Sequence, residues 1–528
     1  MLKLVIAEKP SVAQSLARVI GATERQDGYL EGNGYLVSWC VGHLVELSAP
    51  ERYDERFAKW RLEDLPILPE RFLYEVSAGT SKQYQILKGL MVRPDVESLV
   101  CATDAGREGE LIFRLVYNQC RCKKPFERLW ISSMEDAAIR EGFEKLKPGT
   151  AYDALYEAAL CRERADWIVG MNATRLFSCL YGQTLAVGRV MTPTLAMVVM
   201  RDAQIAAFKP EPFWTVQITA GGITATSSRF QKKDEAESLA ALCREEGKAM
   251  IRTATTKEKL EKPPLLYDLT SLQRDANRIL GFTAQQTLDF TQSLYEKKLV
   301  TYPRTDSRYL TDDMREMLPA LIASVAEKYS YSRDALRTDP VHPTSVFDSS
   351  KVSDHHAIIP TKTMAGSDIK DLSSGEKAVL QLISARLLCS AAEDHRYAEM
   401  TVKLSSGAEE FTKKGKTVLA PGWKAIWQHF YPEKKKDEEA SGPIPAEGTP
   451  VKVDAVEVKE GKTSPPKHFT EDTLLSAMET AGADETPDEA ERKGLGTPAT
   501  RAATIEKLVQ RGFIERKGDS SRKNCKER

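Results

Sequence analysis

Short apolar runs alternate with helical patterns along the first part of the chain. Residues 2–7 form an apolar run that predicts a strand, and residues 10–20 show helical spacing that begins at a proline, where a missing N–H is tolerated. Residues 98–102 form a second apolar run, and helical spacing follows over about 109–118. Because strands and helices alternate, we expect a parallel α/β domain over residues 1–150.

Beyond residue 150 the pattern switches between helix and strand. Helical spacing dominates residues 151–210, 268–330 and 470–515. In contrast, 212–230 and 396–420 alternate β-branched and polar residues as strands do. Two strand-rich stretches that flank a helical one predict a single β domain interrupted by a helical insert.

Composition and charge limit the possible functions. A chain of 528 residues is too long for one hydrophobic core, and 75 Lys and Arg against 76 Asp and Glu give no overall charge that favours nucleic acid. Any nucleic-acid surface must therefore be local. No apolar run approaches the roughly 20 residues of a membrane helix, and the N-terminus lacks a signal-peptide pattern, so we expect a cytoplasmic protein. The nine cysteines, including Cys120 and Cys122, lack paired spacing and are expected to be reduced thiols without zinc.

Three acidic residues follow the two predicted strands of the first domain. Glu8 comes directly after the first strand, Asp104 follows the second, and Glu108 lies at the start of the next helix. The carboxyl ends of parallel strands meet at one edge of a sheet, so these carboxylates are expected to converge. Carboxylate oxygens are ligands that Mg²⁺ prefers, particularly where phosphate completes its shell. A magnesium site is therefore predicted here, with ordinary acidic surface loops as the alternative.

The segment 299–307, which reads LVTYPRTDS, carries a tyrosine and an arginine. Tyr302 precedes a proline, so its backbone is extended, and Arg304 lies two residues on, on the same side. A phenol has a pKa of about 10, so a nucleophilic tyrosine needs a cation or a base nearby. Lys9 and Arg304 are candidates, and Arg304 could also grip a phosphate through two N–H groups. Taken alone, Tyr302 could equally be a turn residue packed against the adjacent helix.

Two motifs together resemble one known family. AEKPS at residues 7–11 and ATDAGREGE at 102–110 are similar to the Toprim domain of topoisomerases, primases and some nucleases. The Tyr302 segment resembles the active-site signature of type IA DNA topoisomerases, in particular those of the bacterial topoisomerase III kind. The resemblance implies that Tyr302 attacks a DNA phosphodiester and becomes joined to the 5′-phosphate.

The same resemblance implies Mg²⁺ as the cofactor, held by Glu8, Asp104 and Glu108. Gly106 stands where the family has a second Asp. This departure implies a weaker or more hydrated metal site and disfavours chemistry with two metal ions.

Further segments are similar to parts of this family that hold DNA: residues 42–47, 59–66, 164–175, 187–194, 354–361 and 494–501. Met191 replaces a usual Gln. The resemblance implies a groove for a single strand, lined by Arg61, Arg164, Arg175, Val187, Gly188, Arg189, Val190, Met191, Thr192 and Arg304. It also places His355 beside the scissile phosphate, where it could donate a hydrogen bond or shuttle a proton. Trp60 and Trp167 could stack bases or pack in the core, and the helix start before Arg501 could take a phosphate.

The resemblance further implies a multidomain toroid built from a Toprim α/β domain, helical domains and a β-rich arch. We assign the Toprim domain to residues 1–150 and the tyrosine-bearing helical domain to 266–398. The arch comprises 211–265 and 399–465, and the helical domain that lines the DNA groove comprises 151–210 and 466–528. Within the arch, the charged and then Pro- and Gly-rich residues 434–448 predict a solvated loop.

The family match stops near residue 517, and the remaining residues are polar and basic. We expect them to lack fixed structure. The last domain would then be truncated, and the apolar face of the helix over 502–510 would be poorly covered.

The predicted function is cleavage, strand passage and religation of single-stranded or negatively supercoiled DNA, without ATP because the sequence contains no P-loop motif. We expect a monomer that does not associate with membranes, with a RecQ-like helicase as a candidate partner. The sequence leaves open whether relaxation or decatenation is the main task. The alternative is a truncated, inactive relative that binds single strands or a helicase; a Toprim nuclease or primase would not need the Tyr302 motif.

Overall fold

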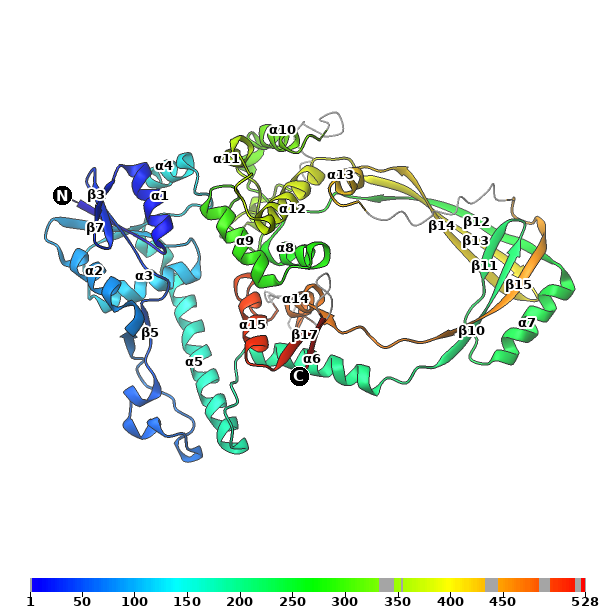
Figure 1. The fold of residues 1–528 in the computed structure, drawn as a ribbon, viewed down its shortest axis with the longest axis horizontal. Helices are drawn as coiled ribbons and strands as arrows, with labels where there is room; N and C mark the ends of the chain where they lie inside the picture. Colours follow the sequence, from blue (N-terminus) through cyan, green and yellow to red (C-terminus); the bar gives the residue numbers. More distant parts are fainter. Residues whose placement is uncertain are drawn as a thin grey trace.

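The chain forms a ring in which an α/β half and a helical body lie beside each other and a β-barrel closes the far side (Figure 1). The computed structural model describes residues 2–331, 346–352, 355–432, 445–483 and 494–517, and the backbone of 524–527. This arrangement confirms the predicted multidomain toroid of α/β, helical and β-rich parts.

The α/β half (residues 2–152) is built on a sheet of seven described strands in the order β2-β3-β4-β1-β7-β8-β9. Strand β1 pairs in parallel with β4 and β7, and β7 pairs in parallel with β8. The strands are β1 (Leu2–Ala7), β2 (Glu24–Gln26), β3 (Tyr29–Gly32), β4 (Tyr35–Trp39), β7 (Val96–Ala102), β8 (Phe126–Arg128) and β9 (Lys147–Pro148). Helices α1 (Pro10–Ile20), α2 (Ser81–Val92), α3 (Arg107–Gln119) and α4 (Asp136–Glu144) cover it. The strands and helices predicted in this region are confirmed.

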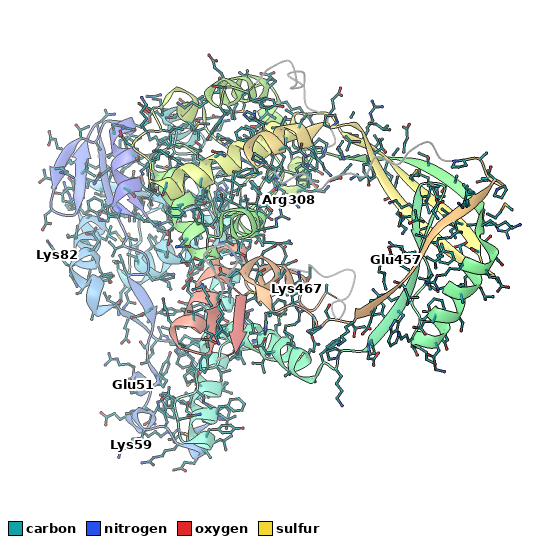
Figure 2. The ribbon with its side chains drawn as sticks, turned by 45° about the vertical axis from the view of Figure 1, so that its right-hand side comes forward. Glu51, Lys59, Lys82, Arg308, Glu457 and Lys467 are labelled. Carbon is teal, nitrogen blue, oxygen red and sulfur yellow. The ribbon has the colours of Figure 1, made fainter. Side chains whose placement is uncertain are left out.

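An insertion between β4 and β7 carries β5 (Val45–Leu47), β6 (Tyr74–Val76) and short 3-10 turns between residues 50 and 64. It hangs beside the long helix α5 (Asp153–Tyr181) in the lower part of Figure 1. Glu51 and Lys59 mark this insertion in Figure 2. Helix α6 (Met191–Ala207) then leads toward the barrel.

Six described strands close a barrel in the order β10-β11-β14-β13-β12-β15. They are β10 (Pro212–Ala220), β11 (Ile223–Thr226), β12 (Lys248–Glu261), β13 (His395–Ser406), β14 (Glu409–Ala420) and β15 (Pro450–Lys462). Closure pairs β10 with β15, so strands from both predicted β-rich stretches share one barrel. Helix α7 (Lys233–Glu246) packs on it, and the turn at Gly221–Gly222 joins β10 to β11. Most of the predicted loop 434–448 lies outside the described residues.

The helical body (residues 266–390) lies between the α/β half and the barrel. Its helices are α8 (Leu269–Asp275), α9 (Ala284–Glu296), α10 (Leu318–Lys328), α11 (Lys362–Gly366) and α12 (Ser374–Ser390), and α13 (Trp423–Phe430) packs on α12. The core of the body is continuous with the α1 side of the α/β half, since buried residues of both form one apolar cluster. This shared core holds the two parts together around the site.

The C-terminal part contains α14 (Glu471–Thr480), α15 (Pro498–Gln510) and a three-stranded sheet of β16 (Phe469–Thr470), β17 (Ile514–Lys517) and β18 (Asn524–Glu527). Two expectations about this part are wrong. Residues 524–527 form a strand, because their backbone pairs with both β16 and β17. The apolar face of α15 is also covered, since Ala502, Ile505 and Leu508 are buried. Strand pairing uses backbone groups, so a polar sequence can still complete a sheet.

The ring encloses an opening that the side chains leave free in Figure 2. Arg308 and Lys467 lie on the side of the helical and C-terminal parts, and Glu457 lies on the barrel side (Figure 2). In the described part of the chain, no helix combines the length and apolarity needed to cross a membrane.

Candidate active site

A cavity of about 770 Å³ lies where the α/β half, the helical body and the start of α15 meet. Glu8 and Asp104 line it from the ends of β1 and β7, while Tyr302, Arg304 and His355 line it from the helical body. The fold therefore brings four of the five predicted catalytic residues to one cavity, although they lie up to 347 positions apart in the sequence (355 − 8). The fifth, Lys9, does not line the cavity and lies at its side. Lys9 lies beside Glu8 with its Nζ 3.7 Å from Glu296.

The loop after β7 is held by close backbone packing. Gly109 lies so close to Asp104 that a Cβ there would come within 2.0 Å of the Asp104 carbonyl oxygen. The hydroxyl of Thr103 donates to the Gly109 carbonyl at 2.7 Å. Any side chain at Gly109 would push α3 away from the strand end and displace Asp104.

Sequence reasoning missed Arg128, which is buried beneath this loop at the end of β8. Its guanidinium donates to the carbonyls of Thr103 and Asp104, each at 2.7 Å, and its Nε lies 3.0 Å from Glu110. A buried arginine that donates to these carbonyls and lies beside a carboxylate restrains the backbone it holds. No sequence pattern identified it, because its partners lie in the loop after β7 and on α3.

Tyr302 is buried, and its phenol donates a hydrogen bond to Asp104 Oδ2 at 2.9 Å. Its ring lies between His355, with ring centroids 4.2 Å apart, and Tyr295, at 5.4 Å. Burial, followed by the charge of Asp104, raises the pKa of Tyr302 well above its usual value, while Arg304 lowers it. The phenol is therefore protonated at rest, and Asp104 is the acceptor placed to take its proton.

Glu8 and Asp104 form a coupled acidic pair. The Asp104 amide donates to Glu8 Oε2 at 3.3 Å. Burial and the neighbouring Asp104 raise the pKa of Glu8 to about 7, whereas Arg304 and Lys9 lower it. A buried carboxylate and a partly buried one that repel each other could hold a divalent cation, because the cation would offset both the burial of the charge and the repulsion that raise the pKa of Glu8.

Glu108 does not join this pair in the structure. Its side chain is 63% exposed, and its carboxylate forms a hydrogen bond with His43 Nε2 at 2.8 Å. This hydrogen bond lowers the pKa of Glu108. Across the described residues, no three His, Cys, Asp or Glu side chains are grouped closely enough to hold a metal ion. Gly106 faces open space, since a Cβ there would meet no atom within 4 Å. Glu8 and Asp104 are the two carboxylates that lie together at this edge and could hold a metal ion, and the role of Glu108 stays a prediction.

Arg304 and His355 flank the tyrosine. Nε of Arg304 is buried and has no hydrogen-bond partner in the described part of the chain. The ring of His355 is buried, which lowers its pKa to about 3, so the imidazole is neutral at physiological pH. A neutral ring can donate one hydrogen bond, so His355 fits a hydrogen-bond donor better than a cation. Asp354, next to it, lies outside the described residues.

The arginines predicted to hold DNA take different positions. Arg175 is buried and donates to the Phe57 carbonyl at 2.7 Å, and its guanidinium lies 5.4 Å from the Trp60 ring centroid. Arg164 lies over the Phe72 ring at 5.0 Å. Both contacts fasten the insertion of residues 50–73 to α5, so these two arginines do not line the cavity.

The remaining predicted DNA residues lie nearer to solvent. Arg189 pairs with Asp166 at 2.6 Å, and Arg61 is exposed with its Nη1 3.7 Å from Glu63. Residues 187–192 turn into α6, where the Gly188 amide donates to Thr192 Oγ1 at 3.1 Å and Met191 packs against the C-terminal core. Trp167 packs against Tyr53 and Phe72, which agrees with the packing alternative for this residue and not with base stacking. Arg107 and Arg162, which the sequence did not single out, line the cavity instead.

Arg175→Ala is expected to lower the free energy of unfolding by about 1–3 kcal/mol, because the Phe57 carbonyl loses its charged donor and Trp60 loses its cation. The salt dependence of DNA binding should not change, since Arg175 does not face the cavity. Thermal unfolding measures the change in stability, and salt titrations of single-strand binding measure the salt dependence. Arg61→Ala is the matched control for stability, because Arg61 is exposed. An unchanged melting temperature with a shallower salt slope would show that Arg175 contacts phosphate after all.

The family models agree with this geometry. The model described as the Toprim domain matches residues 3–134, and the model described as DNA topoisomerase matches residues 150–525. An α/β half whose acidic strand ends face a buried tyrosine inside a ring places the chain in the type IA class. The chain belongs to the DNA topoisomerase family.

Individual relatives show which members of this family the chain is similar to in sequence and fold. DNA topoisomerase 3 of Bacillus subtilis (strain 168) is 42% identical over 98% of this chain and 73% of its own length. DNA topoisomerase 3 of Bacillus cereus (strain ATCC 14579) is 39% identical over the same shares. Topoisomerase I from Thermotoga maritima has a similar fold, with a TM-score of 0.71 and 24% identity over 97% of this chain and 79% of that one. The chain is thus similar to bacterial topoisomerase 3 over nearly its whole length.

Proposed function

We propose that this chain cleaves one strand of DNA through a 5′-phosphotyrosine bond at Tyr302, lets another strand pass, and reseals the break without ATP. One observation gives this proposal its main support. The Tyr302 phenol, on the helical body, is bonded to Asp104, on the α/β half. A nucleophile already bonded to its proton acceptor across a separable interface fits both the chemistry and the strand passage.

In the proposed cleavage step, the phenolic oxygen attacks phosphorus and the bond from phosphorus to the 3′ oxygen breaks. The phenolic proton passes to Asp104, and the leaving 3′ oxygen takes a proton from the acidic pair of Asp104 and Glu8. Arg304, with its unpaired Nε, stabilises the charge on the phosphoryl oxygens, and the His355 Nε2–H can donate to one of them. Religation is the reverse, so the phosphotyrosine bond conserves the energy of the broken bond.

The proposed cofactor is Mg²⁺, held by Glu8 and Asp104, with Glu108 as a third ligand if it leaves His43. The ion would supply positive charge next to the phosphate and favour the ionised form of Glu8. Because Gly106 contributes no carboxylate, we propose one ion, not two.

We propose that the DNA strand enters the cavity between α5 and the start of α15. Arg107, Arg162 and Arg304 face the cavity from the walls, and helix α15 presents its N-terminus there. Arg61, Arg189 and residues 187–192 can extend this path, although Arg189 must first leave Asp166. Single-stranded and negatively supercoiled DNA are the proposed substrates. A cytoplasmic location, a monomeric state, a RecQ-like helicase partner and the domain limits drawn from the sequence remain predictions.

The gate is proposed to open along the contact between the α/β half and the helical body. Besides the site itself, the contact includes Lys298 Nζ to Asp136 at 2.5 Å and the Thr363 amide to Glu135 at 3.1 Å. Lys298 and Thr363 belong to the same body as Tyr302, so opening would break these polar contacts, separate the part of the apolar cluster that spans the two parts, and move the tyrosine with its DNA end. The barrel would keep the ring closed elsewhere.

The test of the function is relaxation of negatively supercoiled plasmid with Mg²⁺ and without ATP. We expect stepwise relaxation, loss of activity with EDTA, and a protein–DNA adduct on the 5′-phosphate after denaturation. Single-strand binding with no adduct at any Mg²⁺ concentration would instead favour the inactive binding protein. Cleavage that leaves no protein attached would favour a Toprim nuclease.

A further inference from the structure

Ser132 lies on the α/β half, in the segment that follows β8, and contacts two of the residues that the helical body brings to the cavity, Tyr302 and His355. Its carbonyl oxygen accepts the Tyr302 amide at 3.1 Å. Its hydroxyl lies 3.0 Å from Nδ1 of His355. These two contacts cross the proposed gate at the nucleophile and at the histidine beside it.

The partners of His355 determine which ring nitrogen carries the proton. Nε2 contacts the Ala105 carbonyl, which can only accept, so Nε2 must be the protonated nitrogen. Burial keeps the ring neutral, as the pKa of about 3 indicates, so Nδ1 has no proton. The contact with Ser132 is then a hydrogen bond in which the serine hydroxyl donates to Nδ1.

The rest of the surroundings fix the plane of the ring but not its tautomer. The Tyr302 ring packs against the imidazole with centroids 4.2 Å apart, and the Trp130 ring lies nearly parallel to it, at 6.4 Å and 12°. These ring contacts restrict the plane of the imidazole. Among the described residues, the hydrogen bonds of the two ring nitrogens go to Ser132 and Ala105.

We propose that Ser132 is a positioning residue that holds His355 in the tautomer with its proton on Nε2. The inference rests on the proposed function, in which a phosphoryl oxygen of the DNA takes over the Nε2–H from Ala105. At that moment the bond to Ala105 is gone, and Ser132 is the partner that keeps the proton on the nitrogen facing the phosphate. The serine acts through His355 and does not touch the reacting atoms.

Ser132→Ala removes the hydroxyl and keeps the carbonyl that binds Tyr302. We expect kcat for relaxation to fall about tenfold with little change in KM, because the DNA contacts stay while the donor loses its orientation. Ser132→Thr retains a hydroxyl and is expected to restore kcat to within about twofold. Ser133→Ala is the matched control, since the hydrogen bond that Ser133 Oγ makes within the described residues is local, from the Glu135 amide at 3.2 Å, and the variant should leave kcat unchanged.

Nitrogen-15 spectra of histidine-labelled protein test the tautomer independently of activity, with His355→Gln assigning the ring. The wild type should show a protonated Nε2 and a hydrogen-bonded, unprotonated Nδ1. In Ser132→Ala the Nδ1 resonance should move to the position of an unbonded acceptor. A wild-type ring protonated on Nδ1, an unmoved Nδ1 resonance in Ser132→Ala, or an unchanged kcat would each overturn the inference. If the wild type relaxed no DNA, the proposed function would fail while the spectra still decided the role of Ser132.

Discussion

Tyr302→Phe is expected to bind single-stranded DNA and to cleave none of it. The substitution removes the phenolic oxygen that attacks phosphorus, so relaxation should fall by roughly four orders of magnitude or more. Phenylalanine keeps the ring that packs between His355 and Tyr295, so the fold should be retained. Plasmid relaxation and recovery of the covalent adduct measure the first effect, and binding of a labelled oligonucleotide measures the second.

The chain offers a matched control for this variant. Tyr295 is also buried, also belongs to the helical body, and contacts the Tyr302 ring edge to face. Tyr295→Phe should keep relaxation within about threefold, since its hydroxyl takes no part in the proposed step. Equal losses in the two variants would mean that tyrosine packing, not nucleophilic attack, limits the activity.

Glu8→Gln is expected to change activity and stability in opposite directions. Burial and Asp104 raise the pKa of Glu8 from 4.5 to about 7, so the folded protein holds a proton that the unfolded chain has lost in this range. The wild-type free energy of unfolding therefore falls as pH rises from about 4.5 to 7, by up to about 3 kcal/mol. Glutamine does not ionise, so the variant avoids this loss. Without Mg²⁺ it should melt at a higher temperature than the wild type at pH 8 and at a similar temperature at pH 4.

The same variant should relax DNA about a hundredfold more slowly at pH 8, because it has lost a proposed magnesium ligand and half of the acidic pair. Glu108→Gln is the control for the stability effect, since the hydrogen bond with His43 lowers the pKa of Glu108 instead of raising it. Removing that carboxylate should not stabilise the protein at pH 8. A Glu8→Gln variant that melts no higher than the wild type at pH 8 would contradict a raised pKa for the buried Glu8 carboxyl.

The local pattern of the sequence was sufficient for several elements and for part of the site. Strand and helix periods placed β1, β7, α1 and α3 correctly, because each period reports which side of an element is buried. Glu8 and Asp104 could be brought together in advance, since the ends of parallel strands share an edge. The link from these residues to Tyr302 came from the family resemblance, because nothing in local spacing joins positions almost 200 residues apart (302 − 104 = 198).

Long side chains were where sequence reasoning failed. Arg175 and Arg164 looked like phosphate ligands, yet α5 turns them toward the insertion it carries, and Arg107 and Arg162 face the cavity instead. Which face of a helix meets which neighbour depends on how the helix is docked, and a flexible charged side chain fits either a buried carbonyl or a phosphate equally well.

By itself, the sequence determined the order of the α/β, helical and strand-rich regions, the acidic strand ends, and the motif that carries Tyr302. The tertiary structure alone decided that Glu108 pairs with His43, that Arg128 fixes the Asp104 loop, and that Ser132 meets His355. It also decided that residues 524–527 complete a sheet. The physical reason is common to all of these: hydrophobic periodicity records burial within one element, whereas a hydrogen bond between distant segments depends on packing that no single segment encodes.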